Sequence, residues 1–266
     1  MDREVRDGEN PGHLWFLGRP DQALDRAKHA VSLAEGAAYA YGRAAAWSQF
    51  AFLHQLRRDE KATRLWAQRT IALGTEQGFP YREAVGKTFH GWAIAQSGQI
   101  ERGIVELKEG IEGCRAAGAE LDGPFYLALL AEAYILAHDR RKAAATLRDA
   151  IERIEGTHSF FYEAELWRLQ GQLHWALASD RTAAADCFRR AIKVAQSQGA
   201  RSLELRAAVS MARLLRERKA YNRGAELLAP VYRSFAGVAE TADLHSARLE
   251  IEALKANAPG AGKWAV

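Results

Sequence analysis

A chain of 266 residues is long enough to bury a sizeable core, and no glycine- or proline-rich linker divides it into separate domains. Lysine and arginine number 37 against 33 aspartates and glutamates, and the two signs are interspersed, so the formal net charge of +4 bears on solubility more than on a partner. No apolar run approaches the ~20 residues that cross a bilayer, and the N-terminus has no apolar core, which argues against a membrane partner and a secretion signal.

Helical periodicity fills most of the chain, in segments joined by short turns. Residues 1–11 are mostly charged or polar, which predicts a disordered tail. Residues 13–18 are typical of the last turns of a helix whose beginning is missing, and Pro20 suits the first turn of a partner helix over 20–34. Further helix pairs are predicted at 37–57 and 60–76, 80–97 and 100–117, 125–137 and 141–155, 160–178 and 182–198, and 202–218 and 221–235. An amphipathic segment over 241–256 is expected to cap the series, and 257–266 is predicted to be disordered.

The breaks and irregularities of these helices have chemical causes. Gly78 suits the left-handed end of one helix, and Pro80 suits the first turn of the next. Pro230 falls late enough in its helix to kink or shorten it. Gly91 and Gly110 lie mid-helix, where glycine costs roughly 1 kcal/mol against alanine. We therefore expect a second helix to cross closely at both positions.

A small, bulky, small pattern recurs on the second helix of each pair at intervals close to forty residues. The first small residues are Ala23, Ala62, Gly103, Ala143, Ala184 and Gly224. The residues four positions later are Ala27, Trp66, Leu107, Leu147, Phe188 and Leu228, and three further on lie Ala30, Arg69, Gly110, Ala150, Ala191 and Val231. Small residues let paired helices approach while the bulky one fills the gap, and a period in this range is typical of stacked helical repeats. The sequence therefore predicts an all-α, right-handed solenoid of about six antiparallel helix pairs over residues 12–256, with a C-terminal capping helix.

Several phrases of the sequence resemble the tetratricopeptide-repeat superhelix, in a variant longer than its usual 34-residue unit. More narrowly, they resemble the C-terminal repeat region of large bacterial adenylate/guanylate-cyclase-like signalling proteins and related ATPase-type transcriptional regulators. The phrases are GWA at 91–93 with Gly98, AELWRLQG at 164–171, QGARSLELRAAVSMARL at 198–214, LLAPVY at 227–232 and TADL at 241–244. The resemblance covers residues 12–256 and implies an interaction scaffold of a bacterial signalling or regulatory system. The cyclase and ATPase domains of those proteins have no counterpart here, so their activities do not carry over, and we expect a free-standing or truncated repeat module.

The first helix of each repeat is expected to line the concave surface of the superhelix. The repeat register places on that surface Gln55, Trp92, Gln96, Glu132, Arg168, Gln172 and Arg213. The register of the fifth repeat is ambiguous by one residue, which affects Arg168 and Gln172. Trp92 is open to a core role, and Glu132 to a salt-bridged or capping role. Polar and aromatic residues on a rigid groove can anchor a polypeptide, so a protein or peptide is the predicted partner.

The incomplete first repeat suggests a second surface. With most of its leading helix absent, the apolar side of 23–34, together with Trp15 and Phe16, is expected to be partly uncovered. Uncovered apolar surface tends to be used in association. The sequence thus also predicts self-association or docking to another protein at Trp15 and Phe16.

No arrangement of residues indicates catalysis, a metal or a cofactor. Cys114 and Cys187 have no CxxC spacing, which fits a reducing, cytoplasmic setting, and the histidines form no ligand-spaced set. The segment APGAGK at 258–263 fails the phosphate-loop pattern because Trp264 stands where a hydroxyl residue is needed and no strand precedes it. Glu163 and Glu165 face different directions on one helix, which removes them as an acid–base pair. We expect a protein that is not an enzyme.

Three functional classes remain, and the shape of the concave face should separate them. An open mixed groove would favour a scaffold that binds a protein or peptide. An enclosed apolar pocket would favour a sensor module that binds a small effector, as a detached part of a cyclase- or ATPase-type regulator. A continuous positive face would favour nucleic acid, but the arginines over 201–223 are diluted by Glu204 and Glu217, which favours a solvated helix face over a phosphate-binding patch.

Overall fold

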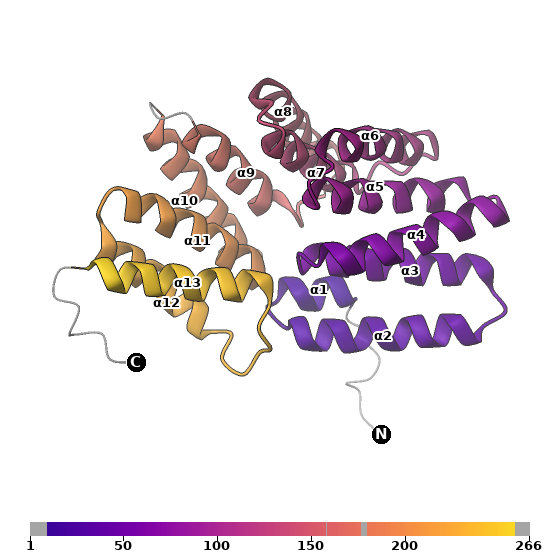
Figure 1. Cartoon of the computed structure of the whole chain (residues 1–266), viewed down its shortest axis with the longest axis horizontal. Coiled ribbons are helices and arrows are strands. Elements are labelled where there is room, and N and C mark those ends of the chain that lie inside the picture. The colour runs from indigo at the N-terminus through magenta and orange to yellow at the C-terminus, as the bar shows by residue number, and fades with distance from the viewer. Residues whose placement is uncertain (1–9, 158, 177–179, 259–266) are drawn as a thin grey trace.

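The structure, a computed structural model, describes residues 10–157, 159–176 and 180–258. Across these residues the chain forms thirteen helices and no strand (Figure 1). The helices are α1 (Pro11–Phe16), α2 (Pro20–Gly36), α3 (Ala40–Leu56), α4 (Glu60–Gln77), α5 (Pro80–Gln96), α6 (Ile100–Ala116), α7 (Gly123–Leu136), α8 (Arg140–Thr157), α9 (Glu163–Trp175), α10 (Arg181–Ser197), α11 (Arg201–Glu217), α12 (Tyr221–Arg233) and α13 (Ala242–Asn257). Consecutive helices pair from α1·α2 to α11·α12 and α13 caps the last pair, so the predicted all-α solenoid is confirmed.

The predicted tails fall largely outside the described residues. Of the segments expected to be disordered, residues 1–9 and 259–266 lie outside that range, while Pro11 begins α1 and Asn257 ends α13. Within the described residues, no helix combines the length and the apolar character that a bilayer crossing requires.

Positive φ angles recur at the turns with the period of the repeat. In the turns within the helix pairs, the residues with a positive φ are Gly18, Arg58, Gly98, His138 and Lys219. In the turns between pairs they are Gly78, Gly118 and Gly199. A left-handed residue closes the end of a helix, and glycine adopts this conformation without a steric penalty. Arg58, with a φ of 60°, adopts it at a cost on the order of 1 kcal/mol or more. The backbone therefore repeats every forty residues even where the sequence changes.

The buried pattern of the second helices is correct in three pairs of the prediction and partly correct in two, where Ala30 is exposed and Val231 is half-buried, but it is wrong by one residue in the pair α3·α4. Ala143, Leu147 and Ala150 are 0% exposed, as the repeat requires. In α4, by contrast, the fully buried positions are Thr63, Ala67 and Thr70 rather than Ala62, Trp66 and Arg69. Threonine fits there because the Thr63 hydroxyl donates to the Asp59 carbonyl at 2.7 Å and the Thr70 hydroxyl to the Trp66 carbonyl at 2.8 Å. Each buried hydroxyl is thus satisfied within its own helix.

Glycines mark the closest approach of helices α5 and α6. A Cβ atom on Gly91 would lie 2.6 Å from the Leu107 nitrogen, and one on Gly110 would lie 2.4 Å from the Thr88 hydroxyl oxygen. On Gly103 it would lie 2.6 Å from the Gly91 carbonyl oxygen. The expectation that Gly91 and Gly110 sit at helix crossings is confirmed. Pro230 likewise lies inside α12, which spans 13 residues against 17 in α10.

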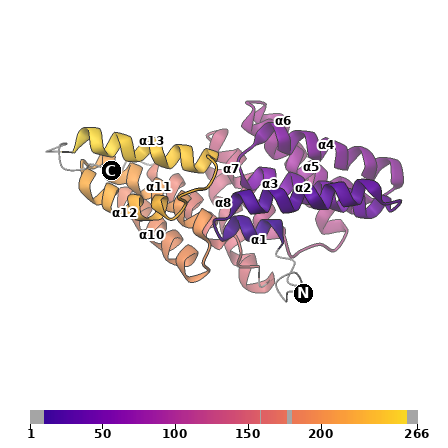
Figure 2. The same cartoon turned by 90° about the horizontal axis from the view of Figure 1, so that it is seen from below.

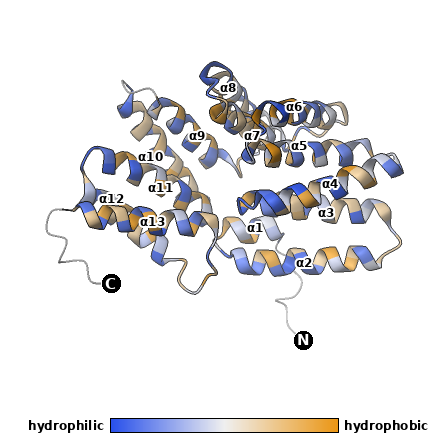
Figure 3. Cartoon of the chain, viewed as in Figure 1, coloured by the Kyte–Doolittle hydropathy of each residue, from blue (hydrophilic) through white to orange (hydrophobic). Residues whose placement is uncertain are grey.

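Helix α7 lies in the middle of the stack and is apolar on nearly all sides. It packs against α5, α6, α8 and α9, and Phe125, Leu129 and Ala131 are almost fully buried. Figure 3 shows apolar residues along α7, whereas hydrophilic residues alternate with apolar ones along α8. This agrees with α7 being enclosed by its neighbours and α8 being an outer helix with one face toward solvent.

The stack curls until its first repeat meets its last pairs. In Figures 1 and 2, α1 lies at the junction between the N-terminal helices and α11. The Ser202 hydroxyl donates to the Trp15 carbonyl at 2.6 Å, and the Ala239 amide donates to the Asp21 carboxylate at 2.9 Å. Arg206 also donates to the Leu56 carbonyl. The concave side is therefore not one open trough but is divided by these contacts.

Candidate functional site

Two adjoining hollows lie along the first helices of the later repeats. A charged pocket of about 160 Å³ is lined by Arg58, Glu132, Arg168, Gln172, Arg206, Val209, Ser210, Arg213, Asp243 and Ser246. An apolar hollow of about 510 Å³ is lined by Glu132, Ile135, Leu136, Gln172, Trp175, Ala176 and Glu217. Because Glu132 and Gln172 belong to both walls, the two hollows form one depression, which we call the groove.

Helix periodicity explains why these side chains share a face. On α11, Val209 and Ser210 lie three and four residues from both Arg206 and Arg213, which places the four on one side of a helix. Arg168 and Gln172 on α9 have the same relation, as do Glu132 and Leu136 on α7. Four residues of the predicted concave set, Glu132, Arg168, Gln172 and Arg213, therefore come together in the groove.

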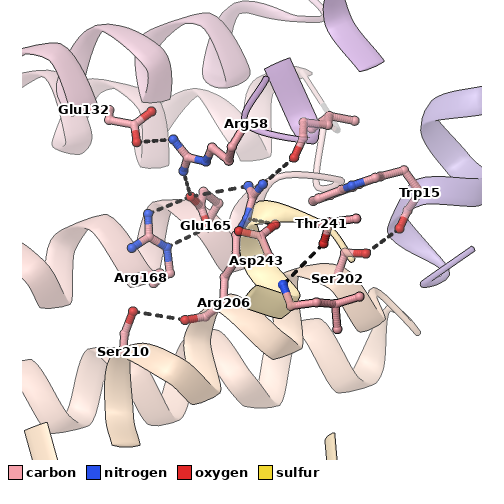
Figure 4. Close-up of polar contacts among 12 residues, drawn as sticks. Trp15, Arg58, Glu132, Glu165, Arg168, Ser202, Arg206, Ser210, Thr241 and Asp243 are labelled. Atoms are coloured by element: carbon pink, nitrogen blue, oxygen red, sulfur yellow. Dashed lines mark hydrogen bonds and ion pairs between the residues drawn. The ribbon is translucent and has the colours of Figure 1, made fainter. Parts of the chain in front are cut away.

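Glu165 is the anion around which the arginines of the charged pocket gather (Figure 4). Its Oε1 accepts from Arg58 Nη2 at 3.1 Å and from Arg168 Nη2 at 2.7 Å, and its Oε2 accepts from Arg168 Nε at 2.8 Å. Burial alone would raise the pKa of Glu165, but the charges of Arg168, Arg206 and Arg58 outweigh burial and lower it to about 2. Glu165 is therefore an ionised, structural carboxylate beneath the groove.

Arg206 connects the groove to both ends of the chain. Its Nε donates to Asp243 Oδ2 at 2.9 Å, its Nη2 donates to the Leu56 carbonyl, and its Nη1 lies 3.8 Å from Glu165 Oε1. The guanidinium carbon lies 4.8 Å from the centre of the Trp15 ring. One side chain on α11 thus contacts the N-terminal repeats and the region of the capping helix at once.

Arg58 closes the pocket from the turn between α3 and α4. It donates to Glu132 as well as to Glu165, and Glu132 in turn accepts from Trp92 Nε1 at 2.9 Å. The backbone of Arg58 is left-handed, with a φ of 60°. Glu132 therefore has the salt-bridged role that the sequence left open, and it also lines the groove.

The other end of the groove is apolar and accessible. Leu136 is 36% exposed, and Trp175 is half-buried, with its Nε1 donating to Glu217 Oε2 at 2.9 Å. This hydrogen bond joins α9 to α11 and holds the indole ring in place. An apolar surface beside a fixed set of charges suits recognition of a polypeptide, because the charges orient a ligand while the apolar part supplies affinity.

Three members of the predicted concave set do not line the groove. Gln55 is 0% exposed, and the carbonyl of the neighbouring Leu56 accepts from Arg206 of α11. Trp92 is 1% exposed and acts on the groove through its hydrogen bond to Glu132. Gln96 is half-buried and lies outside both hollows. For these residues the repeat register identifies the inner helix, but it does not predict which side chains line the groove.

Of the surface expected at Trp15 and Phe16, Trp15 is covered within the chain, whereas Phe16 is half-buried. Trp15 is 2% exposed beneath Arg206, and the Phe16 ring lies 5.7 Å from the Phe161 ring between centroids. The uncovered apolar side that the prediction assumed at Trp15 is therefore absent from this structure. The reason is that α1 is packed against α11 rather than left at an open end.

A separate pocket of about 330 Å³ is lined mainly by α1, α3, α5 and the start of α7, and of these helices only α7 also lines the groove. Aromatic rings form much of its wall, and the full lining is Asn10, Gly12, His13, Phe16, Ser48, Gln49, Phe52, Tyr81, Arg82, Val85, Phe89, Asp122, Phe125, Tyr126 and Phe161. The Phe52 and Phe125 rings meet edge to face at 5.2 Å. We call it the aromatic pocket. No residue of the predicted set except Phe16 lies in it.

The sequence carried one signal that identifies the missed groove residue Arg58. Gly18 and Gly98 occupy the equivalent turn positions forty residues to either side, so an arginine there stands where the repeat favours glycine. Arg206 and Asp243 had no such signal. Among the described residues, no group of three or more histidine, cysteine, aspartate or glutamate side chains could hold a metal ion.

Comparisons with known proteins are consistent with this architecture. No model of a known protein family matches the chain. An uncharacterized protein of Rhizobium meliloti (strain 1021) is 30% identical over 205 residues, which cover 76% of this chain and 20% of the relative, so the chain spans about one fifth of that relative's length.

Solved structures of Rap proteins share the helical-repeat fold. The aspartyl phosphate phosphatase F from Bacillus subtilis superposes with a TM-score of 0.62 at 13% identity, covering 86% of this chain and 58% of that one. The apo form of RapI gives 0.62 at 12% identity, covering 95% and 86%. A Rap protein complexed with Competence and Sporulation Factor gives 0.60 at 13% identity, covering 93% and 72%. At these identities the likeness shows the fold, a TPR-like stack of helical pairs.

Proposed function

We propose that this protein is a non-catalytic interaction scaffold of a bacterial signalling or regulatory system and binds a protein or peptide in the groove. The observation that supports this most is the juxtaposition, around Glu132 and Gln172, of a charged pocket and an accessible apolar hollow. The ion pairs of Arg58 and Arg168 with Glu165 hold the charged part in place before any ligand arrives, which reduces the entropic cost of binding. A Rap protein of the same fold has been solved in complex with a partner named Competence and Sporulation Factor, which supports a binding role for a stack of this kind.

Selection from a random peptide library displayed on phage, with the immobilised full chain as bait, tests the proposal. Enriched peptides should bind the chain in fluorescence anisotropy, and Leu136→Lys should weaken them roughly tenfold or more, because it places a charge on the apolar wall. Leu65→Lys on α4 is the matched control, since Leu65 is 47% exposed and lies outside the groove. Failure to enrich any peptide, or equal loss in both variants, would contradict the proposal.

The alternative is a sensor module that binds a small effector. The aromatic pocket favours this reading, because a concave, aromatic-lined site with a few polar groups suits a small molecule. The two functions use separate hollows that share no lining residue, so they are separable by substitution. We place either activity in the cytoplasm, on the reducing environment suggested by the two free cysteines. Self-association through Trp15 and Phe16 stays a prediction that sedimentation at high protein concentration would check.

A further inference from the structure

The aromatic pocket contains a carboxylate that no cation neutralises. Asp122 lies directly before α7, and its side chain forms no hydrogen bond or ion pair with any residue in the described part of the chain. Burial raises the pKa of this carboxyl group above its usual value. A half-buried carboxylate without a partner is costly for a fold to keep, so its place on the wall of a pocket calls for an explanation.

The same pocket contains a guanidinium that no carboxylate neutralises. Arg82 lies between two rings, with its guanidinium carbon 4.7 Å from the centre of Tyr41 and 5.1 Å from that of Tyr81. Its Nη1 donates weakly to the Ser48 hydroxyl at 3.4 Å, and its Nε is buried without a hydrogen-bond partner. Asp122 and Arg82 do not approach within ion-pair distance of each other among the described residues. Both groups on the pocket wall are therefore free to pair with charges of a bound ligand.

Apolar rings complete the wall around these two charges. Phe89 and Phe125 are 3% and 2% exposed, and Phe52 packs against both, with ring centres at 6.1 Å and 5.2 Å. A volume of about 330 Å³ lies at the small end of the range of ligand pockets. The space therefore suits a molecule of some ten to fifteen heavy atoms rather than a folded segment of another protein, on the order of what such a volume can enclose.

We propose that the aromatic pocket binds a free α-amino acid with a large apolar side chain. Asp122 receives the ammonium group, Arg82 receives the carboxylate, and Phe52, Phe89 and Phe125 surround the side chain. Each charge of the zwitterion pairs with an otherwise unpaired charge of opposite sign, and charge-assisted hydrogen bonds of this kind are the strong ones. The pocket would give the sensor alternative its ligand class, and it does not depend on peptide binding in the groove.

Isothermal titration of the full chain with L-phenylalanine and three analogues tests the proposal without any substitution. L-Phenylalanine should bind saturably, while phenethylamine, which lacks the carboxylate, and 3-phenylpropionate, which lacks the ammonium, should each bind roughly 10- to 100-fold more weakly. L-Phenylalaninamide separates a free amino acid from the N-terminus of a peptide, because it keeps the ammonium and replaces the carboxylate. Equal affinity for the amide, or no saturable binding of L-phenylalanine or L-leucine, would overturn the proposal.

Two conservative variants assign the charges. Asp122→Asn should weaken L-phenylalanine and leave the residual binding of 3-phenylpropionate unchanged, whereas Arg82→Gln should weaken L-phenylalanine and leave that of phenethylamine unchanged. Circular dichroism verifies that each variant keeps its helices. If both variants weaken all ligands equally, Asp122 and Arg82 do not recognise the ammonium and the carboxylate separately, and the proposal fails. Binding of a selected peptide in the groove should be the same in both variants, so failure here and failure of the scaffold function are distinguishable.

Discussion

Arg58 shows at the scale of one residue how the backbone of the repeat serves the groove. Its φ of 60° is strained for any side chain other than glycine, and the gain is a guanidinium that reaches Glu132 and Glu165. Strained residues of this kind cluster at functional sites because surrounding contacts over-determine them. The contact with Glu165 spans 107 positions in the sequence, so no local pattern could have predicted it.

Substitution of Arg58 separates the strain from the ion pairs. Arg58→Ala should lower the free energy of unfolding by about 3 kcal/mol, because Glu132 would lose its ion pair with Arg58 and Glu165 would lose one of its cationic partners. Arg58→Gly loses the same ion pairs but relaxes the backbone, so it should be the less destabilising of the two by about 1 kcal/mol.

Lys219 is the matched control for this comparison. It has a φ of 58°, it is exposed, and no ion pair of its side chain is present among the described residues. Lys219→Gly should therefore stabilise the chain by about 0.5–1 kcal/mol in urea unfolding. If Arg58→Ala and Arg58→Gly have the same stability as the wild type, the ion pairs at Arg58 do not hold the groove together.

The predicted groove residues divide by what surrounds them. Glu132, Arg168, Gln172 and Arg213 lie in the groove because the three- and four-residue spacing of a helix face can be read directly from sequence. Gln55 does not line it, because it is 0% exposed beside Leu56, whose carbonyl accepts from Arg206, 150 positions later in the chain. The helix face on which a side chain lies was therefore predictable from the sequence, whereas its burial by segments distant in the sequence was not.

At the scale of the helix, the sequence specifies the elements well because their ends are chemically marked. The predicted helices 60–76 and 80–97 correspond to α4 (Glu60–Gln77) and α5 (Pro80–Gln96), with Gly78 in the left-handed conformation and Pro80 in the first turn. The predicted buried register of α4 was wrong by one residue. A small, apolar Ala62 is a better candidate for a buried position than a polar Thr63 when the sequence alone is considered. The structure prefers Thr63, whose hydroxyl satisfies itself on its own helix.

The close crossing of α5 and α6 leads to a prediction for Gly110. Gly110→Ala should destabilise the chain by several kcal/mol, on the order of an overpacked core site, because the new methyl group would meet Thr88 at 2.4 Å. Thermal unfolding followed by circular dichroism measures the effect. Gly36→Ala on α2 is the control, since nothing lies within 4 Å of its Cβ position, and it should be neutral or stabilising by up to about 1 kcal/mol. Equal effects of the two substitutions would mean that the helices do not cross so closely in solution.

At the scale of the whole molecule, the curl of the stack decides what the protein offers to a partner. The contacts from Trp15 to Ser202, Leu56 to Arg206 and Asp21 to Ala239 join the first two repeats to the last ones. The groove and the aromatic pocket are separate hollows of the curled stack, and Arg206 lines the groove. Such curvature is the sum of small rotations from one repeat to the next, so the periodic sequence predicts a solenoid without fixing how far it closes. The short α1 matters here, because a longer helix in its place would alter its contacts with α11.

The central claim is that this closure exists in solution and builds the groove, and a crosslinking measurement tests it most directly. Asp21→Cys and Ala239→Cys introduce thiols at positions whose side chain and backbone nitrogen lie 2.9 Å apart. Cys187→Ser removes the half-exposed native thiol, and Cys114 can stay because burial raises its pKa to about 12 and keeps it unreactive. Asp21→Cys with Val105→Cys is the control pair, since Val105 lies on α6, which has no contact with α2.

We predict that a short bis-maleimide joins the 21–239 pair within one chain, rapidly and nearly completely, while the 21–105 pair stays unlinked. A 21–239 pair that reacts no faster than the control would show an open superhelix and contradict the account.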